Sequence, residues 1–161
     1  MSFKPVILVY DLDNKLVDEI AAEIGATGLY TSINTYNESN AMDAIRQYDR
    51  GFGFLTNKLS CVITGWNNYK KPRDQFLYRL RAIEKSSPMR NNTPVILVTE
   101  DHRANLKRRA LDPADGAACA YLHPDDFRAV LIEMLHTVVF QKGAAELNRQ
   151  AREDLEKEIA D

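Results

Sequence analysis

The sequence predicts an α/β domain with a doubly wound, five-stranded parallel sheet and helices on both of its faces. Short apolar runs alternate five times with segments of helical periodicity along the 161 residues. Two of the runs, PVILVY and PVILVT, are almost wholly apolar, as strands buried on both faces are. Strands that alternate with helices are joined by right-handed crossovers, which make neighbouring strands parallel.

The first half of the chain is expected to contain three strands and two helices. A β-branched apolar run at 5–10 predicts the first strand. Asp13 or Asn14 can cap the helix that follows, and Gly25 offers its C-terminal stop. The remaining elements of this half are a weaker strand at 30–36, a helix at 38–48, a loop at 51–58 and a strand at 59–64.

The second half is expected to contain two strands and three helices. The run at 94–99 is the clearest central strand, because it is short, apolar and β-branched. The other elements are a polar loop at 65–71, a helix at 72–85, a basic helix at 101–111, a strand at 117–122 and a last helix from Pro124 or Asp125 to at least Phe140. Five such strand–helix units predict the flavodoxin-like strand order.

The C-terminal segment differs in composition from the rest of the chain. Residues 1–140 are expected to form the α/β domain, and 141–161 form a tail rich in Glu, Arg, Lys and Ala. Opposite charges four residues apart predict that the tail is helical. Its apolar residues form only a narrow stripe, at Leu147, Ala151, Leu155 and Ile159. Both a solvated terminus and an extended helix that links to a partner or to an output module fit this pattern.

Composition and charge argue against several functional classes. The formal net charge of −2 gives no overall attraction to nucleic acid or to anionic membranes. No apolar run approaches the roughly 20 residues that a transmembrane helix needs. Cys61 and Cys119 lie in apolar, strand-like runs, where free buried thiols are expected. We therefore expect a cytoplasmic protein that binds neither nucleic acid nor membranes.

Four sequence blocks resemble the receiver domain of bacterial response regulators over roughly residues 4–140. They are ILVYDLD at 7–13, the stretch 61–81 that ends in FLYRLR, PVILVT at 94–99 and AYLHP at 120–124. Receivers place an acidic pair after the first strand and a switch hydroxyl where Thr99 stands. The resemblance implies a flavodoxin-like (CheY-like) fold and a role in two-component signal transduction.

Three positions that receiver phosphorylation requires are altered. Gly65 stands where the phosphoacceptor aspartate is expected, and glycine cannot form an aspartyl phosphate. Leu12 lies between Asp11 and Asp13, where the second Mg²⁺ ligand is expected. His123 replaces a lysine, and histidine is charged only part of the time near pH 7. The resemblance thus implies a degenerate receiver without catalytic residues or cofactor, although a weak Mg²⁺ site at Asp11 and Asp13 stays open.

The expected function is phosphorylation-independent protein docking or dimerisation. The resemblance implies a partner surface on the helix at 101–111, the strand at 117–122 and the outer face of the last domain helix, with the terminal helix beside it. Its expected contact residues are Arg103, Lys107, Arg108 and Tyr121. The partner would be another protein or a second copy of the chain.

Two other functions stay open. SCVITGW, LYRLRAIEK and the run from PVILVTEDHR through AYLHPDDF also resemble the N-terminal wing domain of bacterial ornithine, lysine and arginine decarboxylases. That resemblance implies an oligomerisation domain of a larger pyridoxal-phosphate enzyme. A small metal-dependent enzyme using Asp11 and Asp13 has less support, because no third ligand is apparent. No Walker or Gly-x-Gly-x-x-Gly loop occurs, so the usual nucleotide-binding loops are lacking.

Overall fold

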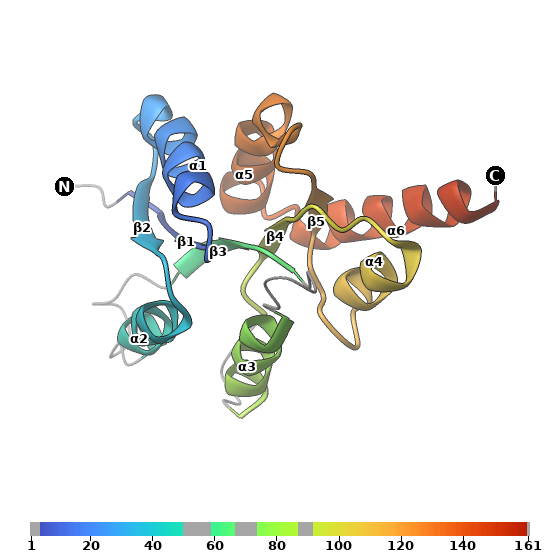
Figure 1. The fold of residues 1–161 in the computed structure, drawn as a ribbon, viewed down its shortest axis with the longest axis horizontal. Helices are drawn as coiled ribbons and strands as arrows, with labels where there is room; N and C mark the ends of the chain where they lie inside the picture. Colours follow the sequence, from blue (N-terminus) through green and yellow to red (C-terminus); the bar gives the residue numbers. More distant parts are fainter. Residues whose placement is uncertain (1–3, 50–58, 67–73, 87–91, 161) are drawn as a thin grey trace.

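A five-stranded parallel sheet forms the centre of the molecule (Figure 1). The computed structural model describes residues 4–49, 59–66, 74–86 and 92–160. The strands are β1 (Val6–Tyr10), β2 (Thr31–Thr35), β3 (Leu59–Thr64), β4 (Val95–Val98) and β5 (Ala120–Leu122). They pair in the order β2-β1-β3-β4-β5, and every pair is parallel. This is the predicted flavodoxin-like order, so the fold class is confirmed.

Helices cover both faces of the sheet, as Figure 1 shows. On one face lie α1 (Asn14–Thr27) and α5 (Leu131–Phe140), with the short 3-10 helix η2 (Phe127–Ala129) before α5. On the other lie α2 (Glu38–Asp49), α3 (Asp74–Lys85) and α4 (Ala104–Leu111). The tail helix α6 (Ala144–Ala160) packs beside α4 and β5. None of the described helices is both long enough and apolar enough to cross a membrane.

The central strands are apolar because each supplies two cores at once. All five residues of β1 are buried. Ile7 and Val9 belong to the core beneath α1 and α5, whereas Leu8 and Tyr10 belong to the opposite core. Successive side chains of a strand point to opposite faces, so a strand between two helical layers has no position for a polar side chain.

The first helix starts as predicted but ends later. The Asp13 carboxylate caps α1 by accepting from two backbone N–H groups, including that of Leu16 at 3.3 Å. Gly25, the predicted stop, lies inside the helix. The chain leaves the helix at Gly28, which has a φ of 68° and donates a hydrogen bond to the Gly25 carbonyl at 3.1 Å. Only a glycine adopts this left-handed conformation without steric cost, so the second glycine ends the helix.

Three other predicted boundaries need correction. Helix α4 begins at Ala104 rather than at 101, because the Asp101 carboxylate holds the extended Arg103 through its N–H and its guanidinium. Strand β5 begins at Ala120 rather than at 117, since Ala117 has a positive φ of 54°. The last helix is divided into η2 and α5. The predictions for 51–58, 67–71 and 72–73 lie outside the described residues.

Candidate functional site

The carboxyl edge of the sheet brings together the residues that the sequence resemblance matches to receiver positions. Asp11 follows β1, Gly65 follows β3, Thr99 follows β4 and His123 follows β5. Asp11 and Thr99 are buried, with exposed fractions of 2% and 1%. In doubly wound sheets, ligands bind outside this edge. It is therefore the candidate site of the fold.

The two aspartates that follow β1 serve the backbone in this structure. Asp11 Oδ1 accepts a hydrogen bond from the Asp13 N–H at 2.8 Å. The Asp13 carboxylate caps α1, so a Mg²⁺ ion bound by both side chains would compete with the capping hydrogen bonds. Within residues 4–49, 59–66, 74–86 and 92–160, no group of three His, Cys, Asp or Glu side chains is placed to hold a metal ion.

Trp66 occupies the core directly after Gly65. Its side chain is fully buried, and its Nε1 donates a hydrogen bond to the Leu106 carbonyl of α4 at 3.1 Å. The indole meets the Tyr78 ring of α3 edge-on at 5.7 Å, and the Arg109 guanidinium lies 5.8 Å from its centroid. The end of β3 is thus tied to α3 and α4 by an aromatic residue, and neither Gly65 nor Trp66 supplies a carboxylate.

Two buried hydroxyls lie on the adjacent strands β3 and β4. The Oγ1 atoms of Thr64 and Thr99 have no hydrogen-bond partner within the described part of the chain. A buried unsatisfied hydroxyl costs about 1–3 kcal/mol, so well-packed cores avoid it. Polar side chains without such partners are typical of a ligand edge rather than of a fully optimised core.

His102 and His123 lie side by side at the β4–β5 end of this edge, with ring centroids 5.3 Å apart. His102 Nε2 donates to the Thr99 carbonyl at 2.9 Å, and the ring meets Tyr121 edge-on at 4.9 Å. Burial, followed by the charge of Lys107, lowers the pKa of His102 below its ordinary value. Burial at this position therefore favours the neutral ring of His102.

His123 is held in place by its own loop. Its Nδ1 accepts a hydrogen bond from the Asp125 N–H at 3.1 Å. The Asp125 carboxylate lies 3.5 Å from the same nitrogen and would pair with the ring only after protonation. Unlike a lysine, an imidazole offers no permanent positive charge to a phosphoryl group.

The basic residues of α4 predicted to contact a partner lie beside α6. Lys107 Nζ is 3.2 Å from a carboxylate oxygen of Glu158, and the side chain of Lys107 is only 14% exposed. Arg108 Nε is 3.8 Å from the carboxylate of Glu156. Part of the predicted partner surface is thus occupied by the chain's own terminal helix.

The other two predicted partner residues contact the β4–α4 loop. Tyr121 donates its hydroxyl hydrogen to the Asp101 carbonyl, and burial raises the pKa of its phenol. Arg103 pairs with the Asp101 carboxylate at 2.7 Å, and its side chain is 61% exposed. Of the four predicted residues, Arg103 is therefore the most open to solvent.

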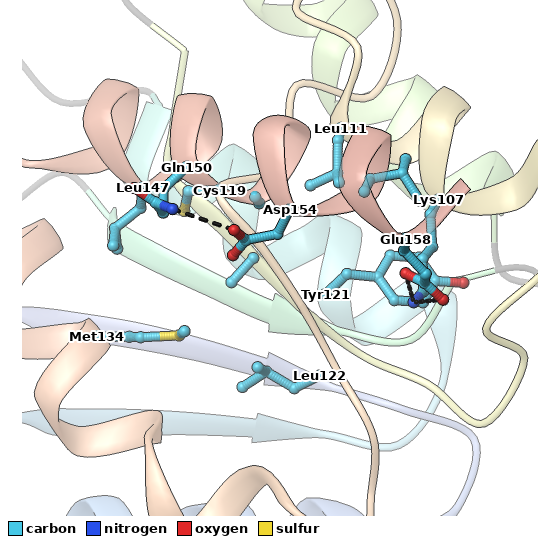
Figure 2. Close-up of a pocket in the computed structure, with 13 residues that line it drawn as sticks. Lys107, Leu111, Cys119, Tyr121, Leu122, Met134, Leu147, Gln150, Asp154 and Glu158 are labelled. Atoms are coloured by element: carbon cyan, nitrogen blue, oxygen red, sulfur yellow. Dashed lines mark hydrogen bonds and ion pairs between the residues drawn. The ribbon is translucent and has the colours of Figure 1, made fainter. Parts of the chain in front are cut away.

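A groove of about 280 Å³ lies between β5 and α6, lined also by residues of α4 and by Met134 of α5. Figure 2 shows Leu122 and Met134 along one side and Leu147, Gln150 and Asp154 of α6 along the other. The Lys107–Glu158 ion pair closes one end of this groove in Figure 2.

Asn148 fixes α6 to the domain. It is 92% buried, its exposed fraction being 8%, and its Nδ2 donates to the carbonyls of Leu111 at 2.7 Å and Ala118 at 2.6 Å. Its Oδ1 accepts from Arg152 Nε at 2.8 Å. Sequence reasoning missed this residue. The sequence signal that could have revealed it is the spacing of seven residues between Asn148 and Leu155, which places both on one face of the helix.

Replacing Asn148 by alanine is expected to lower the free energy of unfolding by about 1–3 kcal/mol, because two buried carbonyls lose their donor. Amide hydrogen exchange should become faster in α6 than in β1. The matched control is Gln150→Ala on the exposed face of α6, which should change stability by less than about 0.5 kcal/mol. Equal effects of the two substitutions would contradict the anchoring role of Asn148.

No family model and no curated protein matches this chain. Solved receiver structures do resemble it. A response regulator receiver domain protein from Clostridium thermocellum is 19% identical, with a TM-score of 0.61 over 86% of this chain and 96% of that one. The signal receiver domain of an HD domain-containing protein from Pseudomonas fluorescens Pf-5 is 18% identical, with a TM-score of 0.62 over 95% of each chain. The chain therefore has the fold of response regulator receiver domains.

Proposed function

We propose that this chain is a receiver-like signalling domain that acts by docking to a protein and does so without aspartyl phosphorylation. Its contacts lie on α4, β5, α5 and α6. The two free thiols, Cys61 and Cys119, are buried and fit a reducing, cytoplasmic location.

The observation that carries this proposal is the replacement of the phosphoacceptor by Gly65 and the buried Trp66. Acyl phosphate formation needs a carboxylate at the end of β3, next to a Mg²⁺ ion and a fixed cation. Here Asp13 caps α1, and His123, which carries no permanent charge, stands where the resemblance places the cation. The site therefore lacks both the acceptor carboxylate and the permanent positive charge that phosphoryl transfer requires.

Incubation with acetyl phosphate and Mg²⁺ is expected to leave the intact mass of the chain unchanged, because no carboxylate lies at the acceptor position. Intact-protein mass spectrometry measures this directly, and a phosphorylatable receiver treated in parallel serves as the control. A stoichiometric phosphate adduct that is lost at alkaline pH, as acyl phosphates are, would overturn the proposal.

The resemblance to decarboxylase wing domains remains a prediction. A pyridoxal-phosphate domain in the same polypeptide would support it and would make the docking partner a part of the same enzyme. In that case α4, β5 and α6 would still be the surface to examine first.

A further inference from the structure

The link between α5 and α6 is short and strained. It consists of Gln141, Lys142 and Gly143. Lys142 has a φ of 55°, a left-handed conformation that favours glycine. A Cβ atom on Gly143 would lie 2.6 Å from Cγ2 of Thr137. Glycine avoids this contact, and its N–H donates to the Thr137 carbonyl at 3.0 Å. The unfavourable backbone conformation of the turn that folds α6 back onto its own domain therefore lies at Lys142.

The same link can be helical. It contains no proline, and Gly143 is its only weak helix former. In a continuous helix, Phe140 would lie on the same face as Ala144 and Leu147, at spacings of four and seven residues. In the folded-back chain, Phe140 is 48% exposed. Its ring there contacts the rings of Tyr30 and His136. Opening the link would relieve the left-handed conformation of Lys142 and place Phe140 on one helix face with Ala144 and Leu147.

The contacts that hold α6 do not require that it belong to the same chain. They lie mainly on α4 and β5, where Asn148 bonds two carbonyls and Leu155 is buried in the core. Lys107 and Arg108 add ion pairs with Glu158 and Glu156. Another copy of α6 would make every one of these contacts equally well, so the two arrangements differ mainly at the link.

We propose that α6 exchanges between two copies of this chain, each α6 docking on the α4–β5 face of the other copy. Short, strained hinges favour such exchange. The exchange rests on the proposed docking function and names a second copy as the partner. It gives a closed, two-fold dimer in which α5 and α6 run on as one helix.

The first test changes the link in two opposite directions. Lys142→Gly relieves the strained turn and is expected to raise the dimer dissociation constant roughly tenfold. Gly143→Ala forces Thr137 to move in the turn and favours helix, so it is expected to lower that constant. Light scattering over a concentration series of the full chain measures both. Monomers at all concentrations for wild type and Gly143→Ala would overturn the exchange.

The second test distinguishes exchange from an ordinary dimer. The variant K107E/R108E and the variant E156K/E158K each place like charges between α4 and α6, in a folded-back monomer and in a dimer with itself. A mixed, exchanged dimer restores opposite charges at both of its interfaces. Mixing the two variants is therefore expected to tighten association roughly tenfold over either alone, and native mass spectrometry identifies the mixed dimer.

The outcomes separate the two proposals. Dimers that show no preference for the mixed pair would overturn the exchange, while the docking function would stand. A stable acyl phosphate would overturn the phosphate-independent function without affecting the exchange. A mixed dimer favoured over both homodimers supports the exchange.

Discussion

Replacing Arg81 by methionine is expected to lower the free energy of unfolding by about 3–5 kcal/mol, because it leaves a buried carboxylate unpaired. The Arg81 guanidinium bonds Glu84 at 2.8 Å and the carbonyls of Gly116 at 2.9 Å, Thr93 at 2.8 Å and Ala117 at 3.2 Å. Both charged side chains are almost fully buried. Urea unfolding followed by circular dichroism measures the loss as a shift of the midpoint.

Two further variants test the cause of this loss. Arg79→Met removes the nearby Arg79–Glu38 ion pair, whose arginine side chain is 55% exposed, and should cost less than about 1 kcal/mol. Adding Glu84→Gln to Arg81→Met should recover part of the stability, since the unpaired charge is gone. If Arg81→Met and Arg79→Met were equally mild, the buried pair would not hold α3 to the β4 and β5 loops.

Replacing Trp66 by alanine is expected to cost about 3–5 kcal/mol, because the indole is fully buried between α3 and α4. Trp66→Phe keeps an apolar ring but loses the bond to Leu106 and part of the buried volume, so an intermediate loss of about 1–3 kcal/mol is expected. Trp66 is the only tryptophan, so circular dichroism must replace fluorescence in both measurements. A loss below about 1 kcal/mol for the alanine variant would show that Trp66 does not stabilise the packing of β3 against α3 and α4.

The strands β1 to β4 could be predicted from the sequence with nearly correct bounds, whereas the start of β5 and several helix ends could not. Short, uniformly apolar runs such as β1 and β4 are typical of strands that are buried on both faces of a parallel sheet. The end of α1 was ambiguous, because Gly25 and Gly28 both offer a stop and only the backbone conformation distinguishes them. The start of α4 depends on the Asp101–Arg103 ion pair, which no periodicity reveals.

The candidate site was partly predictable because the strands that carry its residues were predicted. Asp11, Gly65, Thr99 and His123 each follow a predicted strand, so their shared edge follows from a parallel sheet. The cover of α6 over α4 was not predictable. The predicted apolar stripe does face the domain at Leu147, Ala151 and Leu155, whereas Ile159 is 39% exposed and the buried polar residue Asn148 was not predicted.

The position of α6 also bears on how the sheet avoids unwanted neighbours. β5 is an edge strand, and the free edge of a strand can pair with any other chain. At the opposite edge, β2 is largely polar, with the sequence TSINT. At β5 the protection comes from α6, which lies alongside it (Figure 1). Loss of α6 would therefore expose the edge of β5 together with apolar side chains of α4. Disordered aggregates would then compete with any defined dimer.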